Sequence, residues 1–143
     1  MITGERKRKY LNFFNKTLNG CRKLKEVKMI TELDEKGCPI CVVLFEWVND
    51  CGNMQISIAS RKDWVASKRF FRECFYYAFI ECGAKICTAI VDTRREQAVS
   101  FNLRIGMKKE YDKPIKGFFG DFDGWLFCMK KNECKWLNGV SYE

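Results

Sequence analysis

One segment, residues 54–92, constrains the fold most strongly, because it places a helical pattern between two strand patterns. Its middle part, residues 67–82, has apolar residues at the spacing of one helix face, namely Phe71, Cys74, Phe75, Ala78, Phe79 and Cys82. Gly83 marks the expected end of this helix. The preceding MQISIAS alternates like a strand, and the following KICTAIVD is almost continuously apolar. This order predicts a right-handed crossover between two parallel strands.

Shorter patterns surround this βαβ unit. A helix is expected from Lys7 to Leu18 with Gly20 as its stop signal, and VKMITELDEKGCPICVVLFEWV predicts a hairpin that turns at residues 34–37. A turn at 49–53 leads into MQISIAS as a third antiparallel strand. Residues 93–107 predict another helix, and residues 108–119 and 125–131 predict two final strands, the first at an edge or bulged because of Pro114. We therefore expect one α/β domain of α+β character over residues 1–143, with a mostly antiparallel sheet around the parallel unit.

The balance of charge indicates the class of partner. The chain has 26 Lys and Arg against 18 Asp and Glu, a net charge of +8, which favours nucleic acid, an acidic protein or a phosphorylated cofactor. No apolar run reaches the roughly 20 residues that span a bilayer. The start, MITGERKRKYLNFF, lacks the apolar core and cleavage site of a signal peptide, so a cytoplasmic protein is expected.

The nine cysteines are expected to be reduced core residues, because most lie in apolar stretches. The closest pair, Cys38 and Cys41, forms a C-x-x-C motif. A structural zinc site needs four ligands, and this chain has no histidine and no second C-x-x-C, so no metal is expected. A redox pair is disfavoured because a strand, not a helix, follows the motif.

The element order resembles the GNAT superfamily of acyl-CoA N-acyltransferases over nearly the whole chain. In that family a strand runs into a loop, Q/R-x-x-G-x-G/A, whose N–H groups hold the CoA pyrophosphate at a helix N-terminus. Residues 61–66, RKDWVA, match this loop, with Trp64 where the family has glycine. The resemblance implies acetyl-CoA as co-substrate, held by Ile58, Ala59, Ser60, Arg61, Trp64, Ala66, Ser67, Lys68, Arg69, Arg95 and Asn102. The alternative for the loop is a basic helix start on a solvated face.

A second family motif, N-x-x-A-x-x-x-Y-x-x-x-G-F, aligns with Arg95, Ala98, Asn102, Gly106 and Met107. The sequence of residues 68–110, with the ending MKKNECKWL, more closely resembles a subgroup of the family found in bacteriophages and prophages. The family tyrosine commonly protonates the departing CoA thiolate. Asn102 has no acidic proton and can only donate a hydrogen bond, so catalysis would depend mainly on positioning.

An amine attacks a thioester only when neutral, so an acetyltransferase needs a base. Glu46 is the preferred candidate, with Asp92 also near the expected cleft; the alternative for Glu46 is a solvent-facing charge on a half-buried strand. A backbone N–H near Ile58 is the oxyanion donor that the resemblance implies. Arg94 and Arg95 would hold CoA phosphates or an acidic acceptor, or simply begin a soluble helix.

Four aromatic residues gather around the final turn and suggest either an acceptor pocket or, with more weight, core packing of the hairpin: Phe118, Phe119, Phe122 and Trp125. The predicted function is acetyl-CoA-dependent transfer of an acetyl group to a primary amine, which is a protein lysine, an N-terminus or a small molecule. The alternative is a catalytically inactive GNAT-fold protein that binds nucleic acid or a host protein through its basic surface. A homodimer is left open.

Overall fold

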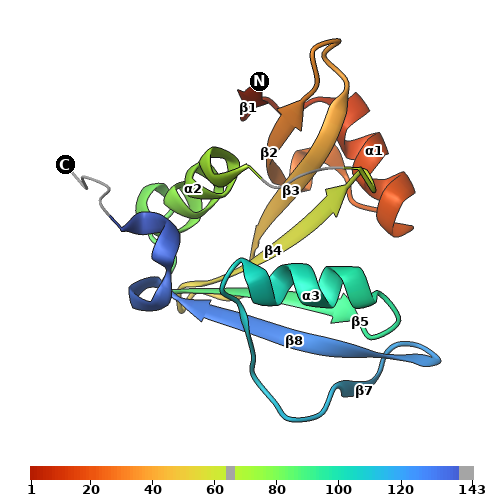
Figure 1. Cartoon of the computed structure of the whole chain (residues 1–143), viewed down its shortest axis with the longest axis vertical. Helices are drawn as coiled ribbons and strands as arrows, with labels where there is room; N and C mark the ends of the chain where they lie inside the picture. The colour runs from red at the N-terminus through yellow and green to blue at the C-terminus, as the bar shows by residue number, and fades with distance from the viewer. Residues whose placement is uncertain (64–66, 139–143) are drawn as a thin grey trace.

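The computed structural model describes residues 1–63 and 67–138. Within them the secondary-structure elements in chain order are β1 (Ile2–Thr3), α1 (Arg8–Leu18), η1 (Leu24–Glu26), β2 (Lys28–Leu33), β3 (Pro39–Trp47), β4 (Asn53–Ser60), α2 (Lys68–Tyr76), η2 (Tyr77–Glu81), β5 (Ile86–Asp92), α3 (Glu96–Arg104), β6 (Lys108–Lys109), β7 (Ile115–Phe119), β8 (Phe122–Lys130), η3 (Lys131–Glu133) and η4 (Lys135–Leu137). Figure 1 shows their arrangement around one twisted sheet.

The sheet has the strand order β1-β2-β3-β4-β5-β8-β6 in the described part of the chain, and β7 also pairs with β8. β4 and β5 are parallel, and every other pair of neighbouring strands is antiparallel. The helix α2 connects the two parallel strands, as the strand, helix and strand patterns predict. The predicted fold class, a mostly antiparallel mixed sheet with one parallel βαβ unit, is confirmed.

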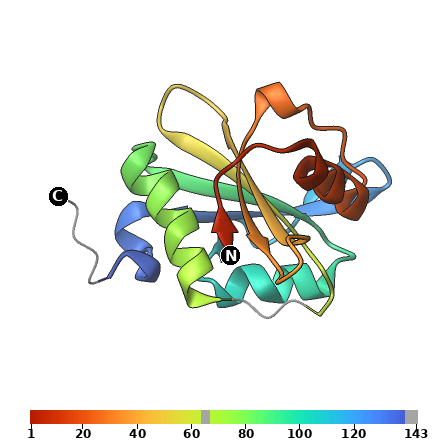
Figure 2. The ribbon, with the colours of Figure 1, turned by 90° about the horizontal axis from the view of Figure 1, so that it is seen from above.

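Alternation along β3 separates two cores. Val42 and Leu44 point to α1, where they pack with Tyr10 and Phe14 in the smaller cluster. The alternate residues of β3, Cys41, Val43 and Phe45, point to the other face and belong to the larger cluster, which also contains residues of α2, α3, β5 and β8. Figure 2 shows α1 and α3 on opposite sides of the sheet. The sheet is therefore covered on both faces, which fixes the strand register, since a shift of one residue would exchange the two faces.

The strongest predicted helix has a wider last turn than its periodicity indicates. α2 ends at Tyr76 and continues as the π-helical turn η2, in which the Cys82 N–H donates to Tyr77 O at 2.8 Å. Gly83 follows with φ of 74°, so the predicted stop is confirmed. A π-turn keeps the chain helical while rotating the following residues, and hydrophobic spacing does not reveal it.

Other boundaries also differ from the predictions. The strand β1 precedes α1 and is not predicted by the sequence pattern. α1 ends at Leu18, as predicted, but its left-handed cap is Asn19, with φ of 53°, and not the predicted Gly20. The expected strand 108–119 is two short strands, β6 and β7, that flank Pro114, as its missing N–H explains. α3 covers only Glu96–Arg104 of the expected 93–107.

All nine cysteines are free thiols. Cys74 and Cys87 are buried as expected, whereas Cys82 and Cys128 are half-buried. The prediction of core cysteines is wrong for Cys21, Cys38 and Cys51, which are exposed because they lie in or beside turns. In the described residues no helix is long and apolar enough to cross a membrane.

Candidate functional site

The strands β4 and β5 pair over only part of their length. Their parallel ladder joins Asn53, Met54 and Gln55 to residues 86–88 and then stops. β4 nevertheless continues to Ser60 alongside β3, and β5 continues to Asp92 alongside β8. Figure 1 shows the two strands diverging beyond the ladder. The facing edges therefore carry backbone N–H and C=O groups that no described strand bonds, and a bound molecule can satisfy them.

Three polar side chains lie in a row where this split begins. Glu46 on β3 is in register with Gln55 on β4, which is in register with Thr88 on β5. Residues in register on neighbouring strands point to the same face of a sheet, so all three share the face that α1 partly covers. Thr88 Oγ1 donates to Asn53 Oδ1 at 3.0 Å, which holds the parallel pair together at its open end.

Glu46, the preferred base, has a cationic neighbour. Its Oε1 lies 3.2 Å from Arg22 Nε, and its side chain is 29% exposed. The N–H does not point at the oxygen, so this ion pair is not also a directed hydrogen bond. The structure therefore places a half-buried carboxylate beside the split, within reach of solvent.

The start of α2 is polar and basic. The Ser67 hydroxyl accepts a hydrogen bond from the Phe70 N–H at 3.3 Å and so caps the helix. Lys68 and Arg69 occupy the first turn, which has no acidic residue, and Arg69 pairs with Glu73 at 3.2 Å. The first N–H groups of a helix lack partners within it, and they attract anions. The predicted residues Trp64 and Ala66 lie outside the described residues.

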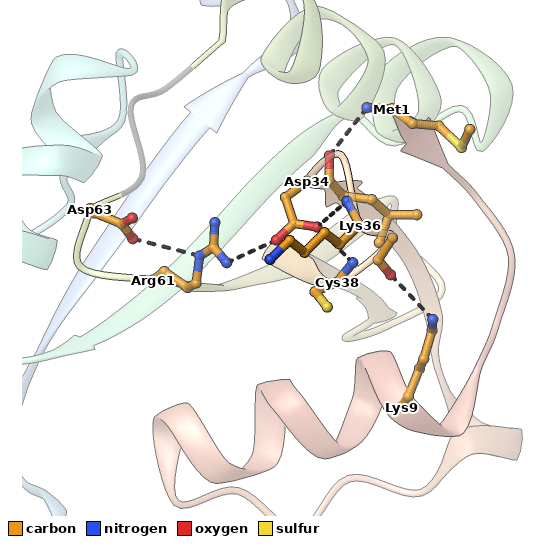
Figure 3. A network of polar contacts seen from close by, with 9 residues as sticks. Met1, Lys9, Asp34, Lys36, Cys38, Arg61 and Asp63 are labelled. Atoms are coloured by element: carbon orange, nitrogen blue, oxygen red, sulfur yellow. Dashed lines mark hydrogen bonds and ion pairs between the residues drawn. The ribbon is translucent and has the colours of Figure 1, made fainter.

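Arg61 ties the end of β4 to the β2–β3 turn. Its Nη1 lies 3.2 Å from Asp34 Oδ2, and its Nε lies 3.6 Å from Asp63 Oδ1 (Figure 3). Its backbone N–H donates to Ile40 O at 2.9 Å. The guanidinium is thus occupied by carboxylates in this arrangement. Its role at a pyrophosphate stays a prediction, and the structure gives it a second role in fixing the start of the loop.

Two predicted site residues lie at the start of α3 and within it, and their surroundings differ. Arg95 Nη2 donates to Thr17 O of α1 at 3.1 Å, which links the start of α3 to α1. Asn102 is only 5% exposed and donates through Nδ2 to Ala98 O at 2.8 Å. Its Oδ1 is buried without a hydrogen-bond partner in the described structure. A buried acceptor without a donor is costly, so a ligand donor would stabilise it.

The similarity of this chain to known proteins lies in its structure. No protein-family model matches the chain, and no curated protein matches its sequence. Solved structures do match. Mutant forms of SpeG, the spermidine/spermine N-acetyltransferase from Vibrio cholerae, have a TM-score of 0.72 at 14% identity and 99% coverage of both chains.

The spermidine N-acetyltransferase from Vibrio cholerae in complex with CoA and spermine has a TM-score of 0.71 at 12% identity, covering 96% of this chain and 98% of that one. A GNAT-family acetyltransferase from Bacillus anthracis has a TM-score of 0.62 at 15% identity, covering 85% and 73%. This chain has the GNAT fold. At these identities the comparison shows the fold, and the chemistry must be argued from the residues.

In this GNAT fold, the predicted cofactor residues of β4 lie beyond the split. Ile58 and Ala59 pair with β3 residues on one side, as does Ser60, and their other backbone edge, on the β5 side, is paired with no described strand. Ala59 is fully buried against α1, whereas Ile58 packs on the larger core. The structure thus places residues 58–60 on the open edge of the split and holds Arg61 in a separate network.

The final hairpin of this GNAT fold corrects one prediction. The prediction of core packing is wrong for three residues, Phe118, Phe119 and Phe122, which are 47%, 40% and 41% exposed. Among the described strands β7 pairs only with β8, and nearly all its residues are exposed. Trp125 does pack on the core, and Lys109 Nζ lies 3.6 Å from its ring centroid.

Arg94, a candidate phosphate ligand, forms an ion pair and a cation–π contact with nearby residues. Its Nη2 lies 2.6 Å from Asp92 Oδ2, and its guanidinium lies 3.3 Å from the centroid of the Phe122 ring. The hydrogen bond from Arg94 holds the pKa of Asp92 below its usual value. A lowered pKa makes a carboxylate a weaker proton acceptor, so Asp92 is a poor candidate for the base. Among described residues no group of three potential ligands could hold a metal ion.

Proposed function

We propose that this chain binds acetyl-CoA between β4 and β5 and transfers its acetyl group to a primary amine. The observation that carries the proposal is the early end of the β4–β5 ladder, after Gln55 and Thr88, while both strands continue. A ligand with amide groups can complete such an edge by hydrogen bonds to the free backbone. The fold shared with acetyltransferases, one of them solved with CoA and spermine, supports this proposal.

The phosphates of the co-substrate would lie at the start of α2. Lys68 and Arg69 supply two cations there, and the helix dipole adds favourable potential for an anion. Arg69 would exchange Glu73 for a phosphate, which is a stronger bidentate partner for a guanidinium. Arg61 and Arg95 would act indirectly, by fixing the end of β4 and the start of α3.

The transfer needs one base and one oxyanion donor. A protonated amine would lose its proton to Glu46, directly or through water, and its neutral nitrogen would then attack the thioester carbonyl. A backbone N–H of β4 near Ile58 would stabilise the oxyanion of the tetrahedral intermediate. Collapse of the intermediate breaks the C–S bond, and the proton still held by the attacking nitrogen passes through water to the CoA thiolate, because Asn102 has no acidic proton to give.

Several finer points stay predictions: the kind of amine, a cytoplasmic location, a single domain over residues 1–143, a bacteriophage or prophage origin, and a homodimer. The alternative of a catalytically inactive protein also has a clear consequence. Such a protein would bind acetyl-CoA without turnover, or would not bind it at all.

Calorimetric titration with acetyl-CoA tests the site. The wild-type protein should bind with a micromolar Kd, and the double variant Lys68→Ala/Arg69→Ala should weaken binding about tenfold or more, since a charged hydrogen bond contributes roughly 1.5–3 kcal/mol. Arg72→Ala, one turn further along α2, is the matched control and should change Kd less than about twofold. No heat of binding for the wild-type protein would refute the proposal.

A panel of primary amines, followed by release of the CoA thiol, tests the chemistry. Glu46→Gln should lower turnover by roughly 100-fold or more, the usual contribution of a general base, while leaving the Kd of acetyl-CoA unchanged. Unchanged turnover would exclude Glu46 as the base.

A further inference from the structure

One groove of this protein is lined by several cations and by no acidic residue. The groove has a volume of about 570 Å³ and lies between α1 and the segment that leads from α1 to β2. Five of its nine lining residues are cationic, and none is acidic: Arg6, Arg8, Arg22, Lys23 and Lys25. Figure 2 shows this segment, in orange, on the same side of the sheet as α1.

These five residues account for most of the charge excess. The whole chain has 26 cations and 18 acidic residues, so 21 cations face 18 acidic residues outside the groove. The rest of the molecule is thus nearly balanced at +3, whereas the groove alone carries +5. A concave surface lined by one sign of charge focuses the field and attracts the opposite charge.

The wall of the groove is fixed in place. Asn15 of α1 donates through Nδ2 to Arg22 O and accepts through Oδ1 from the Arg22 N–H, both at 3.1 Å. The Arg22 side chain pairs with Glu46. The other four cations, Arg6, Arg8, Lys23 and Lys25, form no ion pair with any carboxylate in residues 1–63 and 67–138. Four charges are therefore available to a ligand without breaking an existing ion pair.

We infer that this groove binds the phosphodiester backbone of a nucleic acid. Several separate cations along an open groove match a chain of regularly spaced phosphates, and arginine and lysine are the usual phosphate contacts. Protein interfaces instead have an apolar or aromatic centre. Here the apolar lining is Leu11, which is 2% exposed, and Leu24, so the groove offers little apolar surface to a protein partner.

The groove also disfavours a polyamine as its occupant. Spermine, which is bound in one of the solved neighbours, is a polycation, and four uncompensated cations would repel it. Binding of nucleic acid in the groove does not depend on acetyl transfer, so the two proposals can fail separately.

Fluorescence anisotropy with a fluorescein-labelled single-stranded DNA of mixed sequence, about 20 nucleotides long, tests the inference on the whole chain. The wild-type protein should bind at about 50 mM salt and lose affinity steeply by about 200 mM. Arg8→Ala/Lys23→Ala/Lys25→Ala should weaken binding at least about tenfold and reduce the slope of log Kd against log salt by about 2, because each lost phosphate contact removes roughly 0.7 for single strands.

The matched control is Lys85→Ala/Lys113→Ala/Lys116→Ala, which removes three exposed lysines outside the groove and leaves the same net charge. It should weaken binding less than about threefold, since screening limits the effect of distant charges. Circular dichroism and acetyl-CoA calorimetry on both variants check that each is folded.

Three results would overturn the inference. The first is no binding by the wild-type protein at low salt, and the second is an equal loss of affinity in both triple variants. The third is competition by polyglutamate as strong as that by unlabelled DNA, which would point to an acidic protein as partner. If the wild-type protein binds DNA but does not bind acetyl-CoA, the proposed acetyl transfer alone is refuted.

Discussion

Asp34 and Arg61 form an ion pair, Oδ2 to Nη1 at 3.2 Å, that joins the β2–β3 turn to the residue after β4 (Figure 3). The other carboxylate oxygen of Asp34 accepts hydrogen bonds from the N–H groups of Lys36 and Cys38, both at 2.9 Å. One side chain therefore shapes the hairpin turn and also holds the start of the loop that leads to α2.

These two roles of Asp34 can be separated by mutation. Asp34→Asn keeps an oxygen for the turn and loses the charge, whereas Asp34→Ala loses both. We expect the melting temperature at pH 7 to fall for both variants and to fall further for alanine, because that variant leaves turn N–H groups without their acceptor. Equal melting temperatures for the two variants would show that only the ion pair matters.

The same pair predicts a pH dependence. Hydrogen bonds from the Cys38 and Lys36 N–H groups and from Arg61 hold the pKa of Asp34 below its usual value. Because the pKa is lower in the folded protein, the stabilisation is present above the unfolded pKa, near about 3.9, and is lost as pH falls through the folded pKa. The difference in melting temperature between wild type and Asp34→Asn should therefore be full at about pH 6 and shrink as pH falls below about 3.9. A difference that stays constant over this range would contradict this account.

Truncation of a buried phenylalanine should destabilise the protein much more than truncation of an exposed one. Phe79 is fully buried in the larger core, so Phe79→Ala should lower the free energy of unfolding by about 3–5 kcal/mol in urea titrations. Phe118 is 47% exposed, and Phe118→Ala should change it by less than about 1 kcal/mol. A large loss for Phe118→Ala would mean that its ring is covered in solution.

Thiol labelling should divide the nine cysteines into classes. Burial raises the pKa of Cys41 and Cys74 well above the usual value, so these thiols have almost no reactive thiolate near neutral pH. Cys21, Cys38 and Cys51 are exposed. Iodoacetamide at about pH 8, followed by mass spectrometry, should modify these three first, and all nine only in denaturant. Early labelling of Cys41 or Cys74 would contradict the packing.

Asn102 should be dispensable for stability and important for binding. In Asn102→Leu the buried Oδ1 that lacks a partner is removed, so the free protein should melt at the same temperature or higher. The rise in melting temperature on adding acetyl-CoA should become smaller, because the ligand loses its acceptor. A less stable free variant would contradict this expectation and would mean that the hydrogen bond from Nδ2 to Ala98 O, or a water bound to Oδ1, outweighs the cost of the buried acceptor.

The sequence by itself determined the order of the elements and the parallel unit. The spacing of Phe71, Phe75 and Phe79 predicts the buried face of α2, and this face is confirmed because a helix buries whichever side its periodicity makes apolar. The alternation of β4 likewise predicts its two faces. These features are local, since residues a few positions apart decide them.

Only the tertiary structure decided which distant residues meet. Arg61 pairs with Asp34 across 27 positions, and Arg22 pairs with Glu46 from a different part of the chain, because strand register and helix docking bring them together. The local sequence pattern also could not predict that Phe118 is exposed, since burial depends on whether another element covers the strand. Periodicity depends only on residues that are close in the sequence. Ion pairs, grooves and the split between β4 and β5 depend on how the whole chain packs.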